Sequence, residues 1–327
     1  MKALQSCAGE LVLGYSETGI SGEQIEEFWK QRETEAGADR MKDITLYCSK
    51  GYQTVENQEF GRTSAAMVTE VFGNMNPVFP NRLRRGSLVS QYDEKGCVLS
   101  EDLAEEMFSS HDVEGKMLRI QEQEYVVRGL IDVSGKIVMI QGKKENSYSH
   151  IWISYEGMSS SAAEQELYRI LPQEDKVKSE GDLYVIIGRL ILMIPVLVFF
   201  LVGMIKLRRW YGRKIKNIWI REICGVIHFF AVVLGIYAVI SHGLYITDDY
   251  LPPSWADFSF WGKLWSEKAK DVKGLFAGGM EYRDRRMMWL LVGSGVCSMA
   301  ESTGILRLSG LLFKTKGVTA CTKRDFV

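Results

Sequence analysis

The sequence predicts an α+β domain followed by an all-α membrane region of three helices. Residues 1–182 hold 31 acidic and 20 basic side chains and no long apolar run. Residues 183–327 hold 10 acidic and 20 basic side chains and nearly all of the long apolar runs. A charge difference of this size between two parts of a chain indicates a domain boundary and often a membrane. We therefore place the boundary after residue 182.

The first part of the acidic domain shows signals for both helices and strands. Residues 21–33 predict an amphipathic helix in which Ser21 and Gln24 form a capping box. Residues 44–55 predict a strand, a turn and a second strand. Residues 64–75 predict a short helix.

The stretch 96–131, GCVLSEDLAEEMFSSHDVEGKMLRIQEQEYVVRGLI, carries the clearest local pattern of the domain. Ser100 precedes an apolar stripe at helical spacing and is expected to cap that helix. The stretch predicts one strand, one helix and a two-stranded hairpin, in the order 97–99, 100–108, 116–120 and 124–131. Further strands are expected at 137–142 and 150–156, and a last helix at 160–171. These elements together indicate the α+β class.

Three apolar runs in the second part of the chain predict membrane-spanning helices at 183–206, 223–246 and 287–308. Each is close to the length of about 20 residues that a helix needs to cross the hydrocarbon core. Residues 190–205 contain no charged side chain. The third run contains Glu301 among small residues, which let helices approach closely in lipid. We expect Glu301 to face another helix or water, because an acid in lipid is costly.

The segments between these runs indicate their orientation. The stretch KLRRWYGRKIK, residues 206–216, lies almost wholly in the segment 207–222 and has six basic residues and no acidic one. The loop 247–286 has seven basic and seven acidic residues, and the tail from residue 307 has five basic and one acidic. Because Lys- and Arg-rich segments stay in the cytoplasm, we expect 207–222 and the tail 309–327 inside and the loop 247–286 outside. The acidic domain is then extracytoplasmic, on a multi-pass protein of the cell membrane.

The outside loop is rich in aromatic residues. Tryptophan and phenylalanine concentrate at membrane–water interfaces, and we favour that place for this loop. A cap on the acidic domain fits the same composition. The residues concerned are Trp255, Phe258, Phe260, Trp261, Leu264 and Trp265.

No catalytic pattern appears in the sequence. The acids of residues 101–106 lie in the first turns of a predicted helix, where they complement its dipole. His111 and His150 have no acid partner or nucleophile motif, and GxSxG, HExxH and the phosphate-binding loop are all absent. The six cysteines form no CxxC pair and no zinc spacing, so we expect small buried apolar side chains. We expect no enzyme, no cofactor, no metal and no nucleic-acid partner.

The 96–131 stretch resembles the extracytoplasmic core domain of MacB/FtsX-type ABC transporter permeases. That family has a short strand, a Ser-capped helix rich in Leu, Ala and Phe, a "GK.L.+" strand and a "Y.V.G+" hairpin strand. The matching residues here are Val98, Leu99, Ser100, Leu103, Ala104, Met107, Phe108, Gly115, Lys116, Leu118, Arg119, Tyr125, Val126, Val127 and Gly129. The order of domain, helices and cytoplasmic segments also resembles the family.

The resemblance implies a permease subunit that couples a separate cytoplasmic ABC ATPase to its extracytoplasmic domain, in export or in transmission of movement across the envelope. It implies a homo- or heterodimer of permeases in a lipid bilayer. The residues 212–225 are then the segment that meets the ATPase. Its expected contacts are Arg213, Lys214, Lys216, Trp219 and Arg221.

Two points stay open at this stage. The family has four membrane helices, with the domain between the first and the second, whereas this sequence shows three, so we expect that a first helix is missing here. The same Lys- and Arg-rich segment also fits a purely topological role at the membrane surface. An alternative function is a membrane-anchored extracytoplasmic binding or sensing protein whose helices only hold it in place. An anchor needs one span, whereas a permease needs a bundle.

Overall fold

The computed structural model describes residues 7–15, 19–32, 40–168, 170, 176–243, 248–252, 254, 257, 259–277 and 281–310. The chain divides into two compact units. The α+β unit comprises residues 8–182 and 247–286, and the membrane-helix unit comprises 1–7, 183–246 and 287–327. The segment between the second and third apolar runs therefore belongs to the same unit as the acidic domain.

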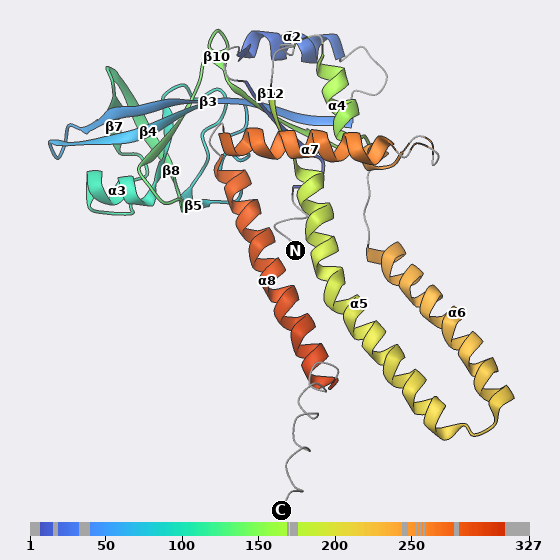
Figure 1. Cartoon of the computed structure of the whole chain (residues 1–327). Coiled ribbons are helices and arrows are strands. Elements are labelled where there is room, and N and C mark those ends of the chain that lie inside the picture. The colour runs from blue at the N-terminus through green and yellow to red at the C-terminus, as the bar shows by residue number, and fades with distance from the viewer. Residues whose placement is uncertain are drawn as a thin grey trace, which may run out of the picture. The chain divides into compact units, whose positions relative to one another are not determined.

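Within the described residues, the α+β unit is built mainly from strands (Figure 1). The strands are β1 (Glu10–Tyr15), β2 (Ile20–Ser21), β3 (Met41–Asn57), β4 (Arg62–Phe72), β5 (Leu83–Gly86), β6 (Gly96–Ser100), β7 (Met117–Ile120), β8 (Gln123–Ile131), β9 (Ile137–Gln141), β10 (Ser147–Tyr148), β11 (His150–Tyr155) and β12 (Lys176–Glu180). The helices are α2 (Gly22–Arg32), α3 (Glu101–Phe108), α4 (Ser160–Leu167), η2 (Asp248–Tyr250) and α7 (Ser259–Ala277).

Ten of the strands form one sheet in the order β12-β1-β11-β3-β4-β9-β6-β8-β5, with β7 paired to both β3 and β8. Most pairs are antiparallel, while β4–β9 and β6–β8 are parallel. Because β7 bridges β3 and β8, the strands β3, β4, β9, β6, β8 and β7 close into a ring. The family-like stretch 96–131 supplies β6, α3, β7 and β8 of this ring.

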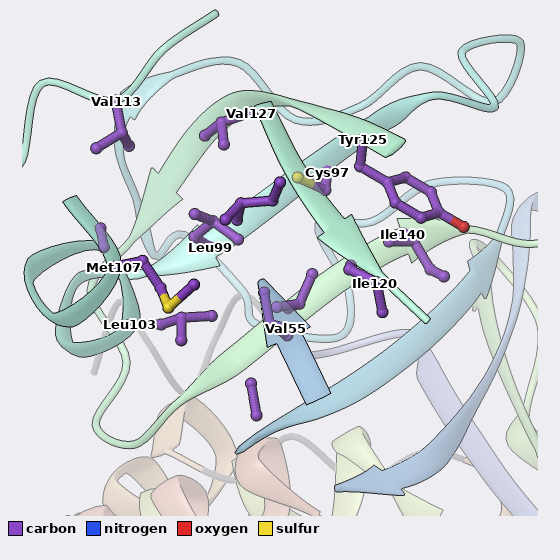
Figure 2. Close-up of a cluster of buried hydrophobic side chains, with 14 of the residues drawn as sticks. Val55, Cys97, Leu99, Leu103, Met107, Val113, Ile120, Tyr125, Val127 and Ile140 are labelled. Carbon is purple, nitrogen blue, oxygen red and sulfur yellow. The ribbon is translucent and has the colours of Figure 1, made fainter. Parts of the chain in front are cut away.

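Alternation along the strands gives the sheet two buried faces, because successive side chains point to opposite sides. One face holds two clusters. The first cluster includes Leu13, Leu46 and Ile153 and is covered by α2 and α4. The second lies within the ring and receives Leu103 and Met107 from α3 (Figure 2). The opposite face holds a third cluster that includes Tyr47, Trp152 and Met139.

The predicted capping box of α2 is confirmed. The backbone N–H of Ser21 donates to Gln24 Oε1 at 2.9 Å, and the N–H of Gln24 donates to Ser21 Oγ at 3.3 Å. The predicted capping by Ser100 is wrong. Ser100 occupies the N-cap position of α3, but its hydroxyl makes no capping bond and accepts the N–H of Ile137 at 3.0 Å instead. This hydroxyl therefore joins the start of α3 to β9.

Two secondary-structure predictions for the first domain are wrong. Residues 64–75 are not a helix: residues 64–72 lie in β4, where Ser64, Ala66 and Val68 are buried in alternation. The helix prediction followed the small and helix-favouring side chains, but pairing with β3 and β9 outweighs that local preference. Residues 44–55 form one strand rather than two, because the pairing of β3 with β4 continues across an irregularity between Ser49 and Tyr52.

Three helices of the described chain are long and apolar enough to cross a membrane, as the sequence predicts. They are α5 (Gly181–Lys214), α6 (Ile218–Gly243) and α8 (Tyr282–Leu308). The α5 helix runs eight residues past the predicted end at 206, so most of the basic stretch is helical. The predicted class, an α+β domain followed by membrane helices, is confirmed.

The membrane-helix unit is held together by contacts of α5 with α6 and with α8. The hydroxyl of Ser298 in α8 donates to the carbonyl of Ile191 in α5 at 2.8 Å. The ring of Tyr211 in α5 meets His228 in α6 edge-on, with centroids 5.7 Å apart. Glu301 is exposed on α8. The tail beyond residue 310 lies outside the described residues.

Candidate functional site

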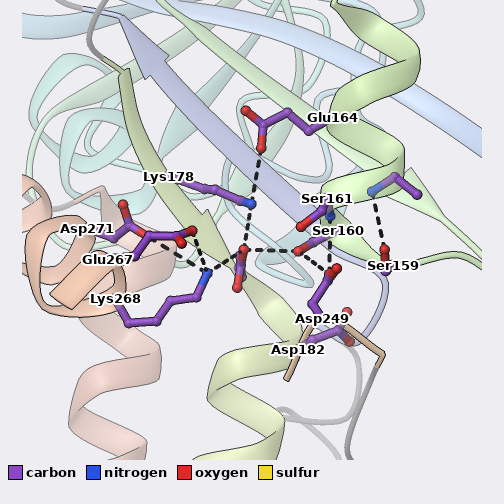
Figure 3. Close-up of polar contacts among 12 residues, drawn as sticks. Ser159, Ser160, Ser161, Glu164, Lys178, Asp182, Asp249, Glu267, Lys268 and Asp271 are labelled. Carbon is purple, nitrogen blue, oxygen red and sulfur yellow. Dashed lines mark hydrogen bonds and ion pairs between the residues drawn. The ribbon is translucent and has the colours of Figure 1, made fainter. Parts of the chain in front are cut away.

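The most concentrated polar chemistry of the α+β unit surrounds Glu180. This residue ends β12, and α5 begins at the next residue. Its side chain is buried, and Oε1 lies 2.7 Å from Lys178 Nζ and 2.9 Å from Lys268 Nζ. Lys178 comes from the same strand, whereas Lys268 comes from α7 (Figure 3). One carboxylate is thus shared by two ammonium groups from different segments.

Further polar groups complete the arrangement. Lys178 Nζ also contacts Glu164 of α4 at 3.1 Å. The hydroxyl of Tyr250 donates to the second oxygen of Glu180. The hydroxyl of Ser160 lies 3.0 Å from Glu180 and 2.9 Å from Asp249. We call this set the junction network: Ser160, Glu164, Lys178, Glu180, Asp249, Tyr250 and Lys268.

The charges of the junction network stabilise one another. Burial alone would raise the pKa of Glu180, but the two ammonium groups outweigh it and lower the pKa to about 2. Burial would lower the pKa of Lys178, but Glu180 and Glu164 hold it above its usual value. Glu180 and Lys178 therefore stay charged at neutral pH, as buried ions must when they are paired.

Asp249 connects the segment after α6 to helix α4. Its carboxylate accepts the backbone N–H of Ser161 at 3.2 Å, and Ser161 lies in the first turn of α4. Burial raises the pKa of Asp249, but the hydrogen bonds from Ser161 and its neighbours outweigh it and lower the pKa below its usual value. An acid at a helix N-terminus is also stabilised by the helix dipole. Asp249 therefore holds this segment against the domain.

Two further contacts secure the first turns of α5 and α8 to the sheet. Asp182 accepts the hydroxyl of Tyr155 at 2.9 Å and the N–H of Gly9 at 3.1 Å. Arg283 Nη2 lies 2.8 Å from Glu10 Oε2 of β1. In the same turn, Asp284 accepts the hydroxyl of Ser179 in β12. The starts of both helices are thus bonded to the edge strand β12 and to its neighbours β1 and β11.

A small cavity of about 140 Å³ lies beside these contacts. His150 and Glu281 face each other there, with Nε2 and Oε1 3.4 Å apart, and the His150 ring stacks on Tyr47. Burial raises the pKa of Glu281 to about 7 and lowers the pKa of His150 to about 4. Both side chains are therefore neutral at slightly acid pH.

The junction network joins chain segments that lie next to the three candidate spans. The segments that meet at the junction network are β12, which continues into α5, η2, which follows α6, and α7, which precedes α8. Each of the three predicted spans is therefore next to a chain segment that is bonded to this edge of the sheet. Among the described residues, no group of three or more His, Cys, Asp or Glu side chains is placed to hold a metal ion.

The residues predicted to contact an ATPase lie elsewhere, at the turn between α5 and α6. Arg213 and Lys214 end α5, Lys216 lies in the three-residue connection, and Trp219 and Arg221 lie in the first turn of α6. All five side chains are exposed. Their chain neighbour Asn217 lies just before α6, and its side-chain oxygen accepts the N–H of Trp219 at 3.0 Å. The turn thus brings the five residues together on one short segment.

The sequence analysis missed the junction network. Its only local signal is the alternation in KVKSE, where Lys178 and Glu180 fall on the same side of a strand. The partners Asp249, Tyr250 and Lys268 lie 69 to 88 positions further along, so no spacing rule links them. One side of α7 in the aromatic loop packs on β12, and the place of this loop at the membrane interface stays a prediction. Trp255 and Phe258 of that loop lie outside the described residues.

These features define a membrane protein whose α+β domain is bonded to the chain segments at the ends of its spans. No protein-family model and no curated protein matches the sequence. Solved structures match it at low identity. The periplasmic region of MacB from Actinobacillus actinomycetemcomitans is 12% identical with a TM-score of 0.44, and the match covers 56% of this chain and 95% of that one.

Two further structures are similar. The extracellular domain of the noncanonic ABC-type transporter YknZ from Gram-positive bacteria is 15% identical with a TM-score of 0.38, covering 48% of this chain and 88% of that one. A domain of a protein described as a permease from Porphyromonas gingivalis is 17% identical with a TM-score of 0.37, covering 52% and 88%.

Proposed function

We propose that this chain is the permease subunit of an ABC transporter of the MacB/FtsX type, which couples a separate cytoplasmic ATPase to an extracytoplasmic α+β domain. The observation that carries the proposal is the junction network. Glu180, immediately before α5, is bonded to Lys268 and Tyr250 from the segment between α6 and α8. A domain that is only anchored in the membrane needs one span. It does not need bonds between the chain segments that precede different spans.

The physical consequence is that the chain segments leading into the candidate spans are tied to the sheet within the α+β unit. Glu180 and its two lysines are mostly withdrawn from water, with side-chain exposures of 3%, 10% and 15%. Buried ion pairs resist separation, because each charge that loses its partner stays desolvated. A shift of β12 relative to α7 would break such a pair, so the segments that lead into the spans are expected to move together with the sheet.

The opposite end of α5 and α6 supplies the proposed ATPase contact. Arg213, Lys214 and Lys216 form an exposed basic group, with Trp219 81% exposed beside it. An exposed tryptophan among cations is typical of a protein contact, since tryptophan and arginine dominate binding energies. We place this turn in the cytoplasm on the positive-inside rule. A pair of such permeases would present two of these turns to a dimeric ATPase.

Photo-crosslinking in cells tests the ATPase contact. A photoreactive amino acid replaces Trp219 in the full chain, and the crosslinked proteins are identified by mass spectrometry. We expect an ABC ATPase in the crosslinked band. The matched control places the same amino acid at Trp265, an exposed tryptophan of α7, and should give no ATPase. The double change Arg213→Glu and Lys214→Glu should weaken the crosslink from position 219.

Accessibility labelling separates the possible failures. A cysteine at position 219 should be protected from a membrane-impermeant reagent in intact cells, and a cysteine at position 52, where Tyr52 is exposed on β3, should react. The reverse pattern would show that the α+β domain faces the cytoplasm and would reject the proposal. The predicted orientation without any ATPase crosslink would instead favour the anchored binding or sensing protein.

A further inference from the structure

The α7 helix exposes a row of large apolar side chains, although it belongs to the α+β unit. Trp261, Trp265, Val272 and Phe276 are 50%, 78%, 38% and 61% exposed. At 100° per residue these positions fall within an arc of about 60° on the helix. They therefore form one continuous strip, which we call the aromatic stripe. A strip of this kind in water is unfavourable unless something covers it.

The neighbouring side of α7 is already occupied by the sheet. Lys268 reaches Glu180, and a Cβ atom at Gly274 would lie 3.4 Å from Val177, so the helix backbone approaches β12 closely there. These contacts fix the rotation of α7 about its axis. The aromatic stripe consequently stays exposed, and it cannot turn into the core of the α+β unit without breaking the ion pair of Lys268.

The remaining side of α7 is cationic. Lys263 and Lys270 lie on the side of the helix opposite the aromatic stripe. Lys273 lies between that side and the stripe. When the aromatic stripe faces lipid, Lys263 and Lys270 therefore point toward water. Tryptophan and phenylalanine on one side with lysine on the other is the composition of helices that lie in the plane of a membrane interface.

The chain keeps α7 close to a bilayer. Four residues separate Ala277 from the start of α8 at Tyr282, a reach of at most about 17 Å. The apolar run of α8 begins at Met287, so about 7.5 Å of helix precedes the hydrocarbon. This length is comparable with the thickness of one headgroup layer, about 5–8 Å. The C-terminal end of α7 is therefore held within reach of the headgroup layer.

We propose that α7 is an interfacial helix whose aromatic stripe inserts between lipid headgroups, in the leaflet on the side of the α+β domain. The same helix then contacts lipid with one side and Glu180 with another. It would hold the domain at a constant height above the bilayer. The inference concerns lipid contact only and does not depend on an ATPase partner.

Spin labels on the full chain in vesicles of three parts phosphatidylethanolamine and one part phosphatidylglycerol test the proposal. Cys224, Cys297 and Cys321 are first replaced by serine or alanine. Labels then go to Trp265→Cys and Phe276→Cys in the aromatic stripe and to Lys263→Cys and Lys270→Cys as matched controls on the same helix. Collisions with oxygen, which concentrates in lipid, and with a water-soluble nickel complex are measured at each position.

We expect the two stripe labels to collide with the nickel complex several-fold less often than the control labels, and with oxygen several-fold more often. Equal collision with nickel at all four positions would show that the stripe is solvated and would overturn the proposal. Protection from both reagents would overturn it as well, because it would place protein, such as a second copy, over the stripe.

A second measurement avoids the risk that a cysteine at these positions disturbs folding. Trp261 and Trp265 are changed together to phenylalanine, which keeps the stripe apolar. The difference between the fluorescence of the parent and that of this variant isolates the emission of the two tryptophans. We expect this emission to be blue-shifted and quenched by lipids brominated near the glycerol end. An unshifted emission that brominated lipids leave unquenched would contradict the proposal.

Discussion

Lys268 and Glu180 form an ion pair of 2.9 Å across 88 positions of the sequence. The residues between them include the helices α5 and α6, which are long and apolar enough to span a membrane. The pair therefore joins the residue that precedes one span to a helix that precedes another. Its loss should affect the stability of the α+β unit more than the loss of any exposed charge.

The change Glu180→Gln removes the charge shared by Lys178 and Lys268. We expect a loss of about 3–5 kcal/mol in the free energy of unfolding, because two ammonium groups stay buried without their main partner. Thermal or urea unfolding of the full chain in nanodiscs measures it. The change Glu267→Gln on α7, where the side chain is 61% exposed, is the control and should cost less than about 0.5 kcal/mol. Equal effects of the two changes would contradict the role of the junction network.

The pair of His150 and Glu281 predicts two opposite dependences of stability on pH. Between pH 4.5 and about 7, Glu281 is protonated in the folded state and ionised in the unfolded state. The contribution of Glu281 to stability therefore falls as the pH rises through this range. Between pH 6.5 and about 4, His150 is protonated in the unfolded state and neutral in the folded state. The contribution of His150 to stability therefore falls as the pH drops through this range. In the parent chain the two effects oppose each other over the shared range.

Single substitutions separate these two effects. The variant His150→Gln should lose stability as the pH rises from 4.5 to about 7, since only Glu281 remains. The variant Glu281→Gln should lose stability as the pH falls from 6.5 to about 4. Melting temperatures measured across this range check both signs. Parallel pH profiles for the two variants would show that the cavity does not hold both groups in their neutral forms.

The second core cluster depends on α3. Met107 is fully buried there, and Met107→Ala should cost about 2–5 kcal/mol, from lost apolar contact and from the cavity left behind. The control Glu105→Ala changes an exposed position of the same helix and should cost well below about 1 kcal/mol. Urea unfolding compares the two. A cost at Met107 no larger than that at Glu105 would mean that α3 does not contribute to the second core cluster.

Two serines at helix starts should respond differently to replacement by alanine. Ser159→Ala removes a hydrogen bond to the N–H of Ala162 and should cost about 1 kcal/mol, the usual effect of a lost cap. Ser100→Ala leaves the N–H of Ile137 without its acceptor and should cost about 1–3 kcal/mol. Hydrogen exchange distinguishes the mechanisms: the amide of Ile137 should exchange faster in the Ser100 variant only.

Much of the fold can be predicted from the sequence where the signals are local. The stretch 96–131 contains an apolar helix face, a strand and a hairpin turn within a few residues of one another, so its elements are predicted correctly. The membrane helices are equally evident, because a long uncharged run has few alternatives. Pairing of distant strands is different. β4 has small side chains that fit a helix, and only its neighbours β3 and β9 make it a strand.

The candidate site shows the same limit more strongly. The basic turn with Trp219 is a contiguous segment, so its composition can be read directly. The junction network cannot be read in this way, since Glu180 has little local signal and Lys268 is one of several lysines in α7. Their meeting depends on β12 taking the edge of the sheet beside β1 and on α7 packing against it. The edge strand β12 itself is polar and was not predicted.

The length of β3 has a consequence for how the α+β unit unfolds. This strand of 17 residues places Leu46 in the first core cluster and Val55 in the second, and it pairs with β11, β4 and β7. Because one unbroken backbone serves both clusters, neither can melt while the other persists. We expect a single cooperative transition in urea, with the amides of Leu46 and Val55 exchanging through the same opening event. Two separate transitions would show that the irregularity at Ser49–Tyr52 uncouples the two clusters.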